Sequence, residues 1–151
     1  MKLRHWMKRE KSGLAFTTLE LVQAEEQQGH AVDLRQPDET LLYGGFEGRP
    51  DVHLIHSQIA PHTYHDRVPK FLFCHGEPLS SVGNGVSMRA IVDLAPVCEA
   101  FIAMRQEEWS AWQSIKKTWV VPKGIDLARF CPLDVPAHDP ANPLSKLSGE
   151  P

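Results

Sequence analysis

Short apolar runs alternate with longer amphipathic segments along most of this chain, and glycine, proline and polar residues separate them. This alternation restricts the fold more than any other feature, because it is the pattern of β-α units arranged around a parallel sheet. The sequence therefore predicts an α/β protein with a mostly parallel sheet and helices on both of its faces.

The apolar runs place the expected elements along the chain. Strands are predicted at residues 3–7, 31–34, 51–56, 70–76, 100–104 and 118–121. The first helix carries Leu14, Thr18 and Val22 on one face and ends at Gly29, a residue that adopts the left-handed conformation without steric cost. Two further helices are predicted at residues 88–94 and 106–115, whereas residues 36–50 are expected to form a loop.

Length and composition indicate one soluble domain. The 151 residues suffice for a single core, and five prolines after residue 131 divide the chain into a domain at 1–131 and a linker or tail at 132–151. A net charge of -3 gives no general attraction to nucleic acid. The sequence has neither a spanning apolar run nor a signal peptide, so a cytoplasmic location is expected. The three cysteines are predicted to be reduced, two of them buried.

Polar residues follow the predicted strands where each strand ends. Ligands of open α/β sheets bind beyond these carboxyl ends, so these residues are the candidates for a functional site. They are Ser12-Gly13, His56-Ser57-Gln58, His75-Gly76-Glu77, Arg105 and Lys123-Gly124-Ile125-Asp126.

Several of these segments, in this order, resemble the N-terminal half of family-four retaining glycosyltransferases, which have the GT-B architecture. Residues 28–32 (QGHAV) resemble the end of that family's first helix, residues 51–57 (DVHLIHS) its D-V-h-H-S-H strand, and residues 71–76 (FLFCHG) its H-G strand. Residues 100–103 match the following strand, and residues 120–132 resemble the v-I-P-N-G-I-D segment that leads into the second domain.

The resemblance implies a Rossmann-like three-layer domain that forms one half of a GT-B enzyme, the half that binds the acceptor. Such an enzyme transfers a sugar from a nucleotide-sugar to an acceptor hydroxyl with retention of configuration, and it requires no metal or other cofactor. The donor-binding domain is not expected within this sequence, so activity would need a donor-domain partner chain or assembly into a homo-oligomer. The alternative is a noncatalytic binding or structural protein that uses the half-fold as a scaffold. Whether the chain is an enzyme therefore stays open at this point.

The resemblance also assigns roles to individual residues. It makes His75 the catalytic residue, hydrogen-bonded at the reacting centre, and Gly13, His56 and Glu77 substrate-binding residues. The alternative for His75 is a strand-end histidine that bonds a backbone carbonyl, and for Glu77 an exposed loop carboxylate. In the final motif the resemblance makes Gly124 and the following acidic residue, Asp126, structural residues of the turn toward the second domain.

A cluster of histidines raises the possibility of a metal site, because imidazole is a common zinc ligand. However, two of them, His53 and His56, are three residues apart on a predicted strand and therefore point to opposite faces of the sheet. Both cannot bind one ion without rearrangement, so no metal site is predicted.

Overall fold

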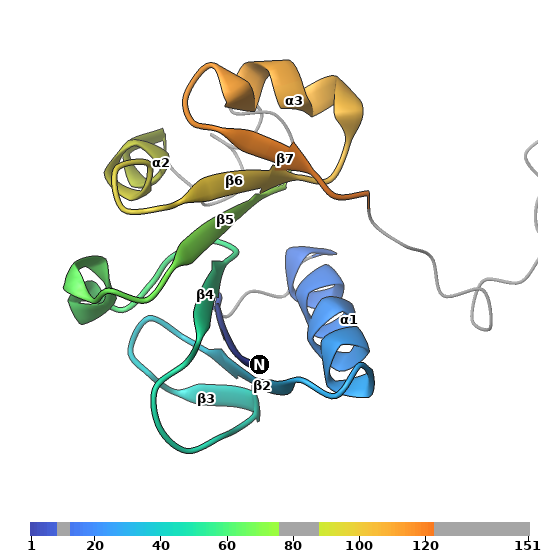
Figure 1. Ribbon diagram of the computed structural model, residues 1–151, viewed down its shortest axis with the longest axis vertical. Coiled ribbons are helices and arrows are strands. Elements are labelled where there is room, and N and C mark those ends of the chain that lie inside the picture. Colours follow the sequence, from blue (N-terminus) through green and yellow to red (C-terminus); the bar gives the residue numbers. More distant parts are fainter. Residues whose placement is uncertain (9–12, 76–87, 123–151) are drawn as a thin grey trace, which may run out of the picture.

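The computed structural model of the protein describes residues 1–8, 13–75 and 88–122. Within these ranges seven strands form one sheet in the order β3-β2-β1-β4-β5-β6-β7 (Figure 1). Neighbouring strands are parallel except β2 and β3, which pair antiparallel. The protein is thus an α/β protein with a mixed, mostly parallel sheet, consistent with a Rossmann-like fold. The strands are β1 (Lys2–Trp6), β2 (Ala31–Arg35), β3 (Leu41–Gly44), β4 (Val52–Ile55), β5 (Lys70–Cys74), β6 (Ala100–Ala103) and β7 (Thr118–Val120).

The strand order contains a switch point between β1 and β4. From β1 the chain moves outward to β2 and β3, and it then returns to the other side of β1 for β4 to β7. Crossovers therefore leave β1 and β4 toward opposite edges of the sheet. In open α/β sheets the crevice at such a point, outside the carboxyl ends of the strands, is the usual ligand site.

Helices cover both faces of the sheet, as the sequence predicts (Figure 1). Helix α1 (Gly13–Gln27) packs on one face, and α2 (Met88–Leu94) and α3 (Gln106–Gln113) lie on the other face together with the short 3-10 helix η1 (Pro61–His65). The crossover through α1 runs toward one edge of the sheet and those through α2 and α3 toward the other, so right-handed connections place the helices on opposite faces. None of the helices in the described ranges combines the length and the apolar character that a bilayer-spanning segment needs.

Helix α1 follows the amphipathic pattern of its sequence. Val22 and Thr18 are fully buried, and the Thr18 hydroxyl donates to the carbonyl of Leu14 at 2.9 Å. The helix ends at Gln27, and Gly29, two residues further on, has a φ of 85° and donates its N–H to the carbonyl of Glu26. The predicted C-terminal glycine is therefore confirmed, because this backbone region is costly for other residues.

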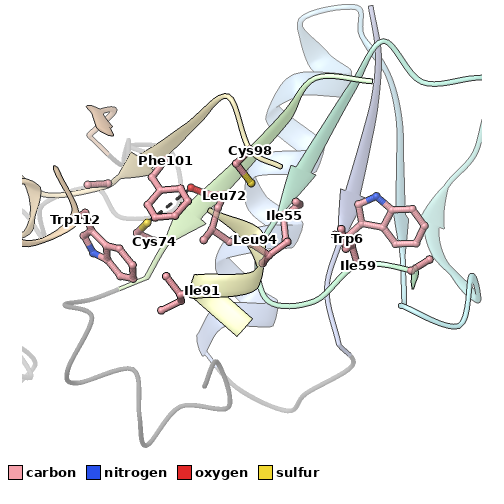
Figure 2. Packing of buried hydrophobic residues seen from close by; sticks show 12 residues of the cluster. Trp6, Ile55, Ile59, Leu72, Cys74, Ile91, Leu94, Cys98, Phe101 and Trp112 are labelled. Carbon is pink, nitrogen blue, oxygen red and sulfur yellow. Dashed lines mark hydrogen bonds between the residues drawn. The ribbon is translucent and has the colours of Figure 1, made fainter. Parts of the chain in front are cut away.

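Two hydrophobic clusters fill the spaces between sheet and helices. Trp6, Ile91 and Trp112 belong to the cluster beneath α2 and α3, where Trp112 meets the ring of Phe101 edge to face at 5.8 Å between centroids (Figure 2). The smaller cluster beneath α1 contains Val22. Among the described cysteines, Cys74 and Cys98 are free and buried in the first cluster, which confirms the prediction of buried thiols. Each face of the sheet thus has its own core.

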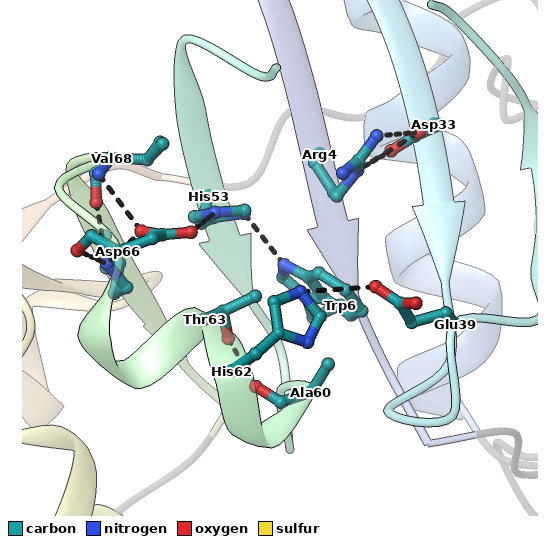
Figure 3. Close-up of polar contacts among 11 residues, drawn as sticks. Arg4, Trp6, Asp33, Glu39, His53, Ala60, His62, Thr63, Asp66 and Val68 are labelled. Carbon is teal, nitrogen blue, oxygen red and sulfur yellow. Dashed lines mark hydrogen bonds and ion pairs between the residues drawn. The ribbon is translucent and has the colours of Figure 1, made fainter. Parts of the chain in front are cut away.

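The pairing of β1 with β2 buries an ionic group. Asp33 has no exposed surface, and its carboxylate accepts hydrogen bonds from Nε and Nη2 of Arg4 at 2.9–3.1 Å (Figure 3). It also accepts one from Nε of Arg35 at 3.0 Å. A buried carboxylate needs such partners, because an unpaired one costs several kcal/mol. This group therefore ties the register of β1 to that of β2.

Residues 36–50 differ from the prediction of a loop, because they contain strand β3. Gly44 is the last residue of β3, and it pairs with Asp33 of β2. The φ of Gly44 is 65°, and a Cβ at this position would lie 2.3 Å from the carbonyl oxygen of Val32. The strand was not predicted because its residues are half-buried or exposed and do not alternate. Backbone pairing along the edge of the sheet, rather than burial of side chains, forms this strand.

Candidate functional site

Two of the predicted site residues lie together at the carboxyl edge of the sheet. His56 directly follows β4, and its backbone N–H donates to the carbonyl of Trp6 at 2.9 Å. His75 directly follows β5, the next strand of the sheet. Their rings are in contact, with His56 Nδ1 3.2 Å from His75 Nε2. The structure thus brings together the histidines from two separate sequence motifs.

Of the other site residues that the resemblance assigns, only Gly13 lies in the part of the chain that the structure describes. Gly13 is the first residue of α1, the helix that follows β1. Glu77, Gly124, Asp126 and the whole of the predicted linker or tail at residues 132–151 lie outside the described residues. Their predicted roles, and the boundary predicted at residue 131, therefore stay predictions.

A third histidine joins the site from β1. His5 Nδ1 lies 3.0 Å from His56 Nε2, and both side chains are buried, with relative exposures of 0% and 1%. The strand pair β1 and β4 flanks the switch point of the sheet, so this contact crosses it. Phe73 packs parallel to the ring of His56 at a centroid distance of 4.8 Å. The histidine site is therefore closed on one side by an aromatic ring.

Glu25 of α1 completes the group. Its Oε2 lies 2.7 Å from Nε2 of His5, and its side chain retains 18% exposure. Sequence analysis missed both residues, although two signals were available. His5 alternates with Leu3 and Met7 on the side of β1 that faces α1. Glu25 follows Thr18 and Val22 at spacings of seven and three residues, which places it on the buried face of the helix.

Burial controls the protonation of the central ring. It lowers the pKa of His56 well below the ordinary value, and a positive charge on His5 or His75, when either ring is protonated, lowers this pKa further. His56 is therefore a neutral imidazole at neutral pH, with one nitrogen that donates a hydrogen bond and one that accepts. Such a ring can orient its two neighbours without adding a buried charge.

A second histidine network lies on the opposite face of the sheet (Figure 3). The indole N–H of Trp6 donates to Nδ1 of His53 at 2.9 Å, and Nε2 of His53 donates to the Asp66 carboxylate at 2.9 Å. Lys70 donates to the other oxygen of that carboxylate at 2.6 Å. This confirms that His53 and His56 point to opposite faces, as the strand periodicity predicts.

The pKa values in this second network fit a structural role. Burial lowers the pKa of His53 despite its contact with Asp66. Burial alone would raise the pKa of Asp66, but hydrogen bonds from Lys70 and His53 lower it overall. These contacts hold η1 and the chain that follows it against β4 and β5. Within the described part of the chain no three histidine, cysteine, aspartate or glutamate side chains are grouped in a way that would hold a metal ion.

Comparison with known proteins adds no assignment. No family model matches the chain, and no curated protein matches it either. The α/β fold and the histidine site at the carboxyl edge of its sheet are therefore the observations on which a functional proposal has to be based.

Proposed function

We propose that this chain is the acceptor-side half of a retaining, nucleotide-sugar-dependent glycosyltransferase of GT-B architecture. The observation that carries the proposal is the contact between His56 and His75 at the carboxyl edge of the sheet, next to the switch point. A ligand site is expected at this edge for reasons of topology. Two sequence motifs that resemble those of the family supply these same two residues.

The chemistry of sugar transfer suits a strand-end imidazole. A neutral ring nitrogen accepts a hydrogen bond from a hydroxyl, and this contact orients the hydroxyl oxygen toward the anomeric carbon that it attacks. The bond to the nucleotide diphosphate breaks as the new glycosidic bond forms. In this proposal His75 contacts the acceptor hydroxyl, and His56 fixes the orientation of the His75 ring. The resemblance assigns the nucleotide diphosphate to a second, donor-binding domain.

Imidazole NMR tests the proposal directly. The chain, labelled with ¹⁵N-histidine, is titrated with glucose, mannose and myo-inositol as hydroxyl probes, and separately with UDP-glucose and GDP-mannose. We expect a hydroxyl probe to shift the ring signals of His75 first and of His56 next, whereas His53 on the opposite face stays unchanged. The nucleotide-sugars are expected to shift these signals less than the hydroxyl probe does.

Two variants make the experiment specific. His75→Asn should abolish the shifts at His56. His62→Asn is the matched control, because the His62 side chain is 63% exposed and pairs with Glu39 at the surface. Its shifts should equal those of the wild type. If no probe moves the His75 signals, or if His53 moves equally, the acceptor-side proposal is wrong and a noncatalytic scaffold is the better description.

A further inference from the structure

The contacts around His56 extend into an unbroken line of four side chains. Glu25, His5, His56 and His75 are joined in this order by contacts of 2.7, 3.0 and 3.2 Å. They come from α1, β1 and the residues that follow β4 and β5, and the line crosses the switch point of the sheet. One end reaches the carboxyl edge and the other reaches the flank of helix α1.

The rings meet in the geometry of true hydrogen bonds. The centroids of His5 and His56 are 5.3 Å apart and their bonded nitrogens 3.0 Å apart. For His56 and His75 the corresponding distances are 5.5 Å and 3.2 Å. In both pairs the distance between the centroids exceeds the distance between the bonded nitrogens by the sum of the two ring radii. The bonded nitrogens therefore lie on the line that joins the centroids. An imidazole N–H points outward along such a line, which aligns donor and acceptor.

The carboxylate at one end sets the direction of every hydrogen bond. Ionised Glu25 only accepts, so Nε2 of His5 carries a proton and donates it. When His5 carries this proton alone, its Nδ1 is the acceptor, and Nε2 of His56 donates to it. Because His56 is also neutral, its Nδ1 accepts from Nε2 of His75. All three rings therefore have the Nε2–H tautomer, and Nδ1 of His75 is the basic nitrogen at the sheet edge.

Burial insulates the middle of the line and leaves one end in contact with water. His5 and His56 have relative exposures of 0% and 1%, and Phe73 covers one face of His56. The Glu25 side chain is 18% exposed, which suffices for exchange of a proton with solvent. A proton moving between the sheet edge and this water has a continuous path through three imidazole rings and the Glu25 carboxylate.

We propose that Glu25, His5 and His56 form a proton relay that carries a proton from His75, at the carboxyl edge of the sheet, to solvent beside helix α1. The relay goes beyond the proposed sugar transfer, because it works for any hydroxyl that gives a proton to His75. Glu25, His5 and His56 are positioning and proton-carrying residues, since none of them contacts that hydroxyl.

The steps conserve atoms and charge. The hydroxyl O–H bond breaks, its electron pair stays on oxygen for the bond that oxygen forms, and the proton binds Nδ1 of His75. The Nε2 proton of His75 passes to Nδ1 of His56, and the Nε2 proton of His56 passes to Nδ1 of His5. His5 is now the imidazolium partner of the Glu25 carboxylate. Its Nε2 proton moves to Glu25 and then to water, and His5, His56 and His75 are all left as neutral Nδ1–H tautomers until the rings turn back.

Histidine tautomers seen by ¹⁵N NMR test the relay without any ligand. At pH 7.5 the wild type should show Nε2–H at all three rings. As the pH falls and the line takes up one proton, His56 and His75 should both change to Nδ1–H over the same pH interval, while both stay neutral. His53, whose Nδ1 accepts from Trp6, should keep its Nε2–H tautomer above the pH at which its own ring takes up a proton.

Variants separate a relay from a structural contact. Glu25→Gln keeps an oxygen that can accept from His5 but removes the negative charge. It should lower the pH midpoint of the tautomer change by about 1–2 units. Glu26→Gln is the matched control, because the neighbouring Glu26 bonds the Tyr43 hydroxyl instead. His56→Phe interrupts the line, so His75 should become doubly protonated at low pH rather than change tautomer.

Each result decides the question. The relay is supported by joint reversal of His56 and His75, together with a lower midpoint in Glu25→Gln but not in Glu26→Gln. It is refuted by an Nδ1–H proton on His56 at pH 7.5, by reversal of one ring without the other, or by equal midpoints in the two variants. The wild-type spectra alone settle the matter if a variant does not fold. Because no sugar is present, failure of the relay is distinguishable from failure of the proposed function.

Discussion

Lowering the pH from 7.5 to 5.5 should destabilise the folded protein, because two buried histidines resist protonation. Burial lowers the folded-state pKa of both His53 and His56, the latter well below its ordinary value of 6.5. Unfolding exposes the rings to water, where they take up protons as the pH approaches that value. In this interval the unfolded state binds more protons than the folded state, so the free energy of unfolding falls as the pH falls.

The size of the effect follows from proton binding to the unfolded state. A ring that stays neutral when folded reduces the free energy of unfolding by about 0.1 kcal/mol at pH 7.5 and by about 1.4 kcal/mol at pH 5.5. His56 should therefore account for a loss of about 1.3 kcal/mol across this range. His53 adds a loss of at most about the same size, because its pKa is lowered less.

Urea unfolding followed by tryptophan fluorescence at pH 7.5, 6.5 and 5.5 measures this dependence. His56→Phe removes the ring with the larger contribution, so at least about half of the pH-dependent loss should disappear in this variant. His62→Asn is the control, because its side chain is exposed and its substitution should leave the slope unchanged. A free energy of unfolding that is constant between pH 7.5 and 5.5, or that rises toward pH 5.5, would refute the reasoning.

Three further predictions concern the buried groups and the glycines. Asp33→Asn should lower the free energy of unfolding by about 3 kcal/mol in urea titrations, because it leaves two arginine side chains without their buried carboxylate; an effect below about 1 kcal/mol would contradict this. Gly44→Ala should cost about 3 kcal/mol or more, since its Cβ would meet a backbone oxygen at 2.3 Å, whereas Gly29→Ala, with open space around it, should cost about 1 kcal/mol. Similar thermal midpoints for these two variants would show that the close contact is relieved. Burial raises the pKa of Cys98 to about 12 and that of Cys74 further, so peptide mapping should find neither thiol modified by a disulfide reagent at pH 8 until the protein is unfolded.

Much of the fold was predictable because its signals are local. The apolar runs at residues 52–55 and 70–74 are strands because a fully buried parallel strand reads as a continuous apolar segment. Gly29 ended its helix as predicted, since a left-handed residue is a requirement of the backbone at that position. The edge strand β3 had no such signal, because its formation depends on backbone pairing with β2 rather than on its own side chains.

The candidate site was predictable only in part. The motif around His75 and the strand end at His56 marked two of its members, whereas His5 and Glu25 were not identified. Their importance depends on contacts across long separations in sequence, 51 residues between His5 and His56 and 20 between His5 and Glu25. A single sequence shows the strand periodicity of each residue but not which strand becomes its neighbour.

The sequence by itself therefore determined the α/β class, the positions of the main strands and helices, and the opposite orientations of His53 and His56. These follow from hydrophobic periodicity and backbone preference, which act over a few residues. Only the tertiary structure decided that β1 lies between β2 and β4, with His5 opposite Leu54. That register puts His5 and His56 on one face, and a shift of one residue would separate them. The line of imidazoles thus exists because strand order and register, which are set by burial across the whole sheet, bring distant residues into contact.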